Sequence, residues 1–129
     1  MSEPEVLAAV DAIIDDFGHH RRDAYFAGFA EDATFVFHTG RGRLESRADY
    51  EAEWDRWERE EGFRVLACHS SARRLQQIGD DVAIFTHDVE TELADGEGSI
   101  TLQERETIVL QRRDGRWLCV HEHLSGRDA

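Results

Sequence analysis

The second half of the chain contains four long β-rich runs that are joined by short turns. Asp114-Gly115 joins the last two, and an Asp-Gly pair between apolar runs is the strongest local signal for a β-hairpin. Strands joined by turns this short pair antiparallel, because a parallel pair needs a crossover of a dozen residues or more. The sequence therefore predicts a four-stranded antiparallel sheet over residues 63–77, 80–93, 101–112 and 116–125.

The first half of the chain has the apolar spacing of helices, interrupted by one short run that is typical of a strand. Ser2 is the expected N-cap of the first helix, Gly62 is expected to end the third, and His19-His20 is expected to form an exposed turn. Helices followed by a meander indicate an α+β fold, with three N-terminal helices packed in a strongly curved, mainly antiparallel sheet. We expect one domain over residues 1–129, with helices over 4–17, 21–29 and 47–61 and a strand over 33–38.

The charge of the chain limits its partners. The formal net charge is −13 at pH 7, which argues against a nucleic-acid backbone or an anionic membrane surface as a partner. No run reaches the roughly 20 apolar residues of a membrane span, and the N-terminal residues lack the pattern of a signal peptide. The 2 cysteines fit a reducing compartment better than a disulfide scaffold. We therefore expect a cytoplasmic protein.

Two histidines share one face of the last predicted strand. Successive side chains of a strand point to opposite faces, so Trp117, Cys119, His121 and His123 lie on the same side. Trp117 and Cys119 are the expected core anchors, and both histidines are therefore predicted to point inward. The same alternation places His87 on the apolar face of its strand.

The neighbour of these histidines on the preceding strand depends on the register. Counting outward from the Asp114-Gly115 turn puts Glu106 on the face of the histidines. An extra residue in the turn, or a β-bulge, would put Arg105 there instead. A carboxylate would raise the pKa of a histidine and an arginine would lower it, so the two registers predict different chemistry.

Three stretches of the chain, "AYFAGFAEDATFVFH", "IGDDVAIFTHDV" and "RETIVLQRRDGRWLCVHEHLS", resemble the SnoaL-like branch of the NTF2-like superfamily, which includes the ketosteroid isomerases. The resemblance implies a cone with a pocket at its wide end, used for acid–base chemistry on small apolar molecules or only to bind them. It also implies that Arg105 faces inward, which favours the second register. The catalytic aspartate of the isomerases has no counterpart after the first strand, where only His38 could replace it.

These features predict a cofactor-independent acid–base enzyme, a lyase, isomerase or cyclase, for a small and largely apolar substrate. Imidazole titrates near neutral pH, so His121 or His123 is the expected proton carrier, and Arg105 is expected to hold a carboxylate or a developing enolate oxygen. The catalytic candidates are His121, His123, Arg105 and His87. The substrate-binding candidates are Tyr25, His38, Trp54, Trp57 and Phe85.

Two alternatives remain open. His121 and His123, together with His87 and with His38 or His69 as further candidates, could provide a three-nitrogen site for zinc, iron or copper. The chain could instead be a non-catalytic binding or association module. We expect a small-molecule ligand and a homodimer formed through the convex face of the sheet, because "TIVLQ" and "WLCVHEHL" are apolar on both sides and large exposed apolar patches are rare on monomers.

Overall fold

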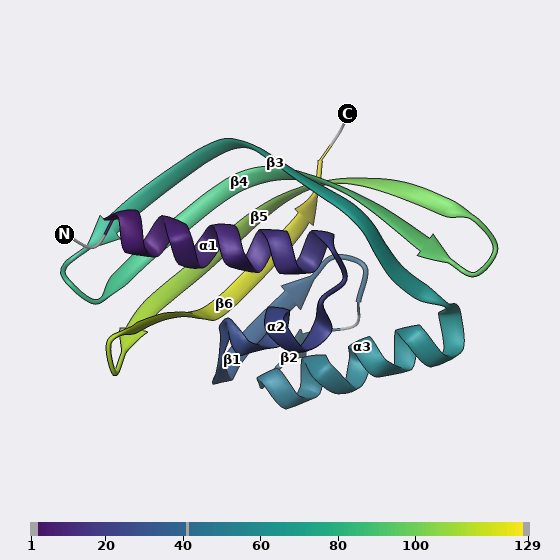
Figure 1. The fold of residues 1–129 in the computed structure, drawn as a ribbon, viewed down its shortest axis with the longest axis horizontal. Helices are drawn as coiled ribbons and strands as arrows, with labels where there is room; N and C mark the ends of the chain where they lie inside the picture. The colour runs from purple at the N-terminus through teal and green to yellow at the C-terminus, as the bar shows by residue number, and fades with distance from the viewer. Residues whose placement is uncertain (1–2, 41, 128–129) are drawn as a thin grey trace.

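The computed structural model describes residues 3–40 and 42–127 (Figure 1). Its elements, in chain order, are α1 (Glu3–Gly18), α2 (Arg22–Ala27), β1 (Phe29–Phe37), β2 (Arg43–Leu44), α3 (Arg47–Glu61), β3 (Phe63–Ile78), β4 (Val82–Asp95), β5 (Ser99–Arg113) and β6 (Arg116–Gly126). This order confirms the predicted α+β fold class, while Ser2, the expected cap of α1, lies outside the described residues. In the part of the chain that is described, no helix is long and apolar enough to cross a membrane.

The sheet has six strands in the order β2-β1-β6-β5-β4-β3. The strands β3 to β6 form the predicted antiparallel meander. β1 adds to this sheet by pairing parallel with β6, and β2 then pairs antiparallel with β1. β1 begins at Phe29, earlier than expected, because α2 ends at Ala27 and is capped by Gly28, whose N–H donates to the Tyr25 carbonyl at 3.1 Å. The first strand of the chain thus lies beside its last one.

The helices cover the concave face of the curved sheet (Figure 1). α1 packs mainly on β3, and it buries Val6, Val10 and Ile13, which share one helical face. α3 packs on β1 and β3. Its start is capped by Ser46, whose side chain accepts a hydrogen bond from a backbone N–H, and its end by Gly62 at a φ of 65°. The sheet and helices together enclose the core.

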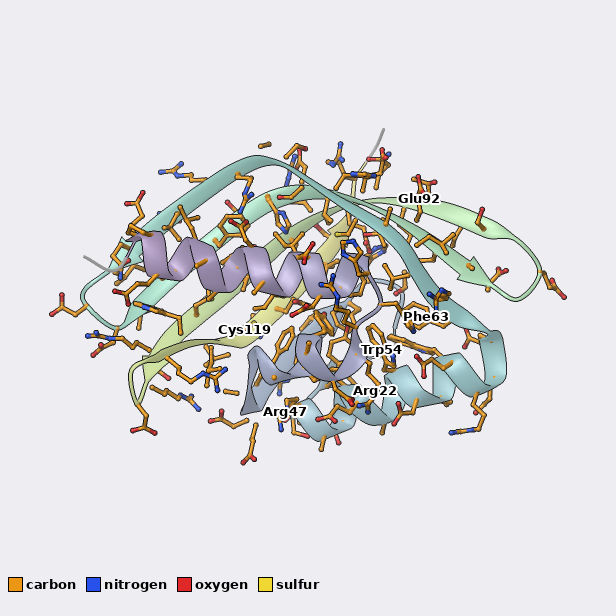
Figure 2. All side chains as sticks on the ribbon, in the orientation of Figure 1. Arg22, Arg47, Trp54, Phe63, Glu92 and Cys119 are labelled. Carbon is orange, nitrogen blue, oxygen red and sulfur yellow. The ribbon has the colours of Figure 1, made fainter. Side chains whose placement is uncertain are left out.

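An aromatic cluster forms the part of the core between α2, α3 and the sheet (Figure 2). Trp54 is fully buried and packs edge-on against Phe26 and Phe63, at 5.5 and 4.9 Å between ring centroids. Phe85 is also fully buried in the core. Burying a large apolar side chain contributes about 1.5–3 kcal/mol. Trp54 and Phe85 were predicted to line a substrate site. This placement is wrong, because both rings are buried in the core and enclosed by other side chains of the protein.

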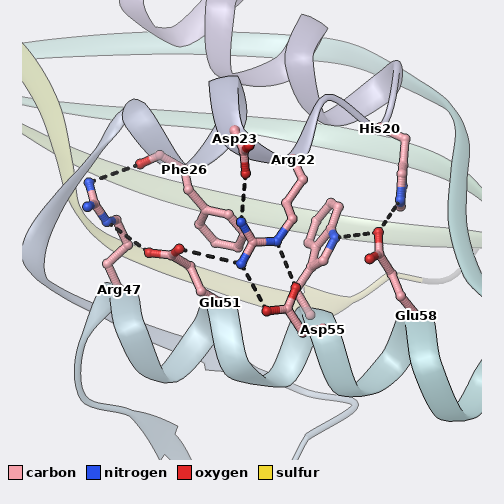
Figure 3. A network of polar contacts seen from close by, with 9 residues as sticks. His20, Arg22, Asp23, Phe26, Arg47, Glu51, Asp55 and Glu58 are labelled. Atoms are coloured by element: carbon pink, nitrogen blue, oxygen red, sulfur yellow. Dashed lines mark hydrogen bonds and ion pairs between the residues drawn. The ribbon is translucent and has the colours of Figure 1, made fainter.

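A network of ion pairs fixes α3 to α2 (Figure 3). The Arg22 guanidinium donates two hydrogen bonds to Asp55, at 2.8 and 3.1 Å, and Arg47 donates to the Phe29 carbonyl at 3.1 Å. The Arg22 and Asp55 side chains are partly exposed, so solvent screening limits the pair to about 0–1 kcal/mol. Its planar two-point geometry nevertheless sets how α3 lies over the sheet.

His20 connects α1, α3 and β3 (Figure 3). Its Nδ1 accepts a hydrogen bond from the Val65 N–H at 2.9 Å, so Nε2 carries the proton that is donated to Glu58 at 2.6 Å. Glu58 also accepts a hydrogen bond from the indole N–H of Trp54 at 2.9 Å. The His20 side chain is only 10% exposed, so the expected exposed turn is wrong for this residue. Its ring therefore has a structural role and connects the end of α1 to α3 and β3.

Candidate active site

A cavity of about 110 Å³ lies between the helices and the concave face of the sheet. Most of its surface is apolar. Tyr25 and Trp57, two of the predicted substrate-binding residues, are part of its lining. The aromatic wall consists of Phe17, Tyr25, Phe37, Tyr50, Trp57 and Phe63.

A β-bulge in β6 decides which of its side chains reach the cavity. Leu110 of β5 pairs with Cys119, but Val109 pairs with His121, so Val120 is an extra residue in β6. Before the bulge, Cys119 points into the core and is fully buried. After it the alternation is reversed, and Glu122 rather than His121 is on the inner face.

The predicted inward orientation of His121 and His123 is therefore wrong. His121 lies on the convex face, where its Nδ1 is 2.8 Å from the Thr34 hydroxyl, and His123 is exposed. The strand pattern "WLCVHEH" gave the correct face for its first half, but a single extra residue inverted the second half.

Arg105 lies on the same face as these histidines, as the second register requires, but this face is the convex one. Its side chain is 62% exposed and donates to Asp88 at 2.9 Å. The alternation of β5 is uninterrupted here, and its inward side chains include Glu106 and Ile108. The prediction that Arg105 lines the pocket is therefore wrong.

Three buried carboxyl groups lie on the sheet side of the cavity instead. Glu104 and Glu106 of β5 are 6% and 9% exposed, and Glu122 of β6 is 2% exposed. Glu122 pairs directly with Ile108, so it is the diagonal neighbour of Glu106 on the inner face. No arginine or histidine is among the described residues that line the cavity. Sequence reasoning missed this cluster, although Glu104 and Glu106 lie on the same face of β5 as the apolar Ile108 and Leu110.

His87 lies behind Glu106 rather than in the cavity. As predicted, it is on the inner face, and it is 2% exposed. Its Nε2 is 2.6 Å from a carboxyl oxygen of Glu106, and its Nδ1 is 2.6 Å from the Ser70 hydroxyl. Burial, followed by the nearby charge of Arg73, lowers the pKa of His87 to about 4. The imidazole is therefore neutral near pH 7.

The carboxyl groups of Glu106 and Glu122 hold their protons unusually tightly. Burial is the main cause and raises the pKa of Glu106 to about 8. Burial also raises the pKa of Glu122 well above its ordinary value, and the charge of Glu106 raises it further. Although Glu106 and His87 are at ion-pair distance, both pKa shifts favour the neutral forms. In this state the Glu106 O–H donates to Nε2, and the His87 Nδ1–H donates to Ser70.

Two tyrosines and a thiol complete the polar lining. The hydroxyls of Tyr25 and Tyr50 are 3.0 Å apart, and burial raises the pKa of both well above the usual range. A hydrogen bond from Tyr25 to Glu122 lowers the pKa of Glu122 and so offsets part of the increase that burial causes. Burial raises the pKa of Cys68 to about 12, so this residue lines the cavity as a neutral thiol.

His38, the predicted substitute for a missing carboxylate base, contacts Glu104 instead of the cavity. Its Nε2 is 2.6 Å from the Glu104 carboxyl oxygen. His38 is thus a partner of a cavity carboxyl rather than a ligand contact.

The histidines do not converge on one point. His87 is on the concave side of the sheet, whereas His121 and His123 are on the convex side. Within residues 3–40 and 42–127, no group of three or more histidine, cysteine or acidic side chains has the arrangement of a metal site. The predicted three-nitrogen set is therefore not assembled.

The chain thus combines a curved sheet wrapped around helices with a mostly apolar cavity that contains a few polar groups. A family model for the SnoaL-like domain matches residues 6–127, and the chain belongs to this family. The predicted family is thus confirmed.

Similar solved structures agree in fold. A ketosteroid isomerase-like protein from Erwinia carotovora atroseptica is 17% identical, with a TM-score of 0.83 over 99% of this chain and 98% of that one. An NTF2-like protein of unknown function from Prochlorococcus marinus is 14% identical, with a TM-score of 0.79 over 100% and 95%. The CamKII hub homology domain of Chlamydomonas reinhardtii is 17% identical, with a TM-score of 0.76 over 99% and 100%. At these identities the similarity establishes the NTF2-like fold alone.

Proposed function

We propose that the cavity is an acid–base site in which Glu106 and Glu122 exchange protons with a small, largely apolar molecule. The supporting observation is a pair of buried carboxyl groups, on adjacent strands, that open on an aromatic-walled cavity. Their raised pKa values bring the proton exchange of a carboxyl group close to neutral pH, where general acid–base catalysis is most effective.

The pair can both donate and accept a proton. Glu106 and Glu122 are neighbours on the inner face, and the negative charge of one carboxylate disfavours ionisation of the other. The first ionisation of the pair therefore leaves one neutral acid beside one carboxylate. In the proposed reaction the neutral acid donates to an oxygen or nitrogen of the bound molecule, and the carboxylate accepts a proton from an adjacent carbon. The apolar walls exclude water, which strengthens both interactions.

His87 and Ser70 support Glu106 from the side opposite the cavity. The neutral imidazole accepts a hydrogen bond from the Glu106 O–H through a 2.6 Å contact, which orients this carboxyl group. His87 is fixed in turn by the Ser70 hydroxyl. We therefore assign His87 as a positioning residue, and Glu106 and Glu122 as the groups that meet the ligand.

Proton exchange with a bound ketone tests this proposal. Cyclopentanone in D₂O exchanges its α-hydrogens when an acid and a base act together, and NMR measures the rate. We expect the protein to accelerate this exchange, and Glu106→Gln and Glu122→Gln to reduce the acceleration by about 100-fold or more, because general acid–base catalysis contributes about 10²–10⁴-fold. Glu92→Gln is the matched control, since Glu92 lies on β4 and is not part of the cavity (Figure 2).

The outcomes separate a catalytic role from a structural one. Equal exchange rates in wild-type protein and in folded Glu106→Gln and Glu122→Gln variants would refute the proposal. If either variant unfolds, the pH profile of the wild-type rate still decides, because the rate should change with the ionisation of the pair near pH 8. A rate that is flat between pH 6 and 9 would count against it.

A second candidate function, association through the convex face, rests on a different surface. Ile84, Val109 and Leu118 lie on this face and are each partly exposed. One similar structure is a hub homology domain. We propose a homodimer that covers this face. Light scattering at micromolar concentration should give twice the chain mass of 14.8 kDa, and a monomer mass would refute the dimer.

A further inference from the structure

We propose that the natural ligand of the cavity carries a basic nitrogen, so that it binds as a small cation with an apolar body. This inference builds on the proposed acid–base site and names the class of molecule it takes. It rests on the charges, the ring faces and the mouth of the cavity.

The polar groups of the cavity are suited to a cation and unsuited to an anion. The lining contains three carboxyl groups, from Glu104, Glu106 and Glu122, and no positively charged side chain among the described residues. Glu122 is 2% exposed, so its carboxyl group has little contact with bulk solvent and is available mainly to a molecule inside the cavity. An anionic ligand would bring into this buried site a negative charge that no described lining residue compensates. An ammonium group would instead pair with carboxylates.

The aromatic wall adds a second and independent attraction for a cation. Tyr25, Tyr50, Trp57 and Phe63 line the same cavity as the carboxyl groups. The faces of aromatic rings carry partial negative charge, and a cation within about 6 Å of a ring centre gains about 0.5–2 kcal/mol. Carboxyl groups and aromatic rings around one cavity together suit an ammonium group with an apolar substituent.

The size and the mouth of the cavity limit the body of the ligand. A volume of about 110 Å³ is close to the ~150 Å³ of an apolar cavity that holds benzene, so a single small ring fits. Trp57 and Phe63 also border a groove that continues outward from the cavity. Among the described residues, Asp49, Glu53 and Glu61 line this groove together with one arginine, Arg56, so the described part of the approach to the cavity is acidic. Such a surface steers cations toward the mouth.

Cation binding is coupled to proton release in this site. In the empty cavity burial keeps Glu106 protonated, with a pKa of about 8. An ammonium group next to the pair favours the carboxylate, and a proton leaves to solvent. Binding of an amine at pH 7 should therefore release about one proton per ligand, whereas a neutral molecule of the same shape should release none.

A matched series of five-membered rings tests the inference by titration calorimetry on the full chain. The probes are cyclopentylamine, cyclopentanol and cyclopentanecarboxylate, measured at pH 7 in two buffers that differ in ionisation enthalpy. We expect the amine to bind at least about tenfold more tightly than the alcohol and the carboxylate not to bind. Glu122→Gln should weaken amine binding about tenfold or more and weaken alcohol binding much less, while Glu92→Gln should behave as wild type.

The wild-type series decides the question even if Glu122→Gln does not fold. Alcohol binding as tight as amine binding, or amine binding without proton release, would overturn the inference. Ketone exchange without amine preference would overturn the ligand class and leave the acid–base function. Amine binding with no ketone exchange would overturn the acid–base function and leave the ligand class.

Discussion

The pH dependence of folding should report the buried Glu106 directly. Its pKa rises from 4.5 to about 8 on folding, so the folded chain holds a proton that the unfolded chain has already lost. This stabilisation is fully present below pH 4.5 and is lost as the pH rises to about 8. At about 1.4 kcal/mol per pKa unit, the full range corresponds to about 5 kcal/mol.

His87 opposes Glu106 over the lower part of this range. Its pKa falls from 6.5 to about 4 on folding, so the unfolded imidazole takes up a proton first and stability is gained as the pH rises from 4 to 6.5. The two effects nearly cancel below pH 6.5. Between pH 6.5 and 8 only the carboxyl effect remains, and the free energy of unfolding should fall by about 2 kcal/mol. Glu122 is shifted in the same direction as Glu106 and makes the fall steeper.

Urea unfolding, followed by tryptophan fluorescence at pH 6.5 and 8, measures this change. Glu106→Gln should reduce the fall by at least half, because it removes one proton and also the charge that raises the pKa of Glu122. Glu92→Gln should retain the wild-type fall. A free energy of unfolding that stays constant or rises over this interval in the wild type would refute the neutral state assigned to the pair.

Two further predictions check the corrected positions. Trp54→Ala should destabilise the fold by about 3–5 kcal/mol in urea unfolding, because it empties a fully buried site; a loss below about 1 kcal/mol would contradict its place in the core. His123→Ala should change the free energy of unfolding by less than about 0.5 kcal/mol and leave ketone exchange intact, because its side chain is exposed on the convex face. Loss of ketone exchange in this variant would show that His123 belongs to the site.

Local patterns predicted the elements of the fold but not their long-range pairing. The Asp114-Gly115 turn and the alternation of the late strands were sufficient for the meander, and helical spacing was sufficient for α1 and α3. The parallel pairing of β1 with β6 joins residues almost ninety positions apart, as at Phe35 and Glu122, and no local signal specifies it. The family resemblance gave the architecture but not this register.

The candidate site was harder to predict because it depends on one backbone irregularity. The inner face of β5 could be predicted from Glu106, Ile108 and Leu110, two of which are apolar, but the histidine pattern of β6 indicated a different set of side chains. The bulge at Val120 has no sequence mark, since valine is as ordinary in a regular strand as in this one. Only the pairing partners of Cys119 and His121 reveal it.

The same bulge has a consequence for how relatives of this chain should be compared. In β6 the imidazoles of His121 and His123 alternate with the carboxyl group of Glu122, so the two kinds of functional group point to opposite faces. One residue of strand length decides which set faces the cavity and which faces the outside. A relative without the counterpart of Val120 would present imidazoles inward from an almost identical stretch. Two chains aligned letter by letter over this strand can therefore differ completely in the chemistry of their interiors, and an insertion or deletion of one residue is enough to exchange one for the other.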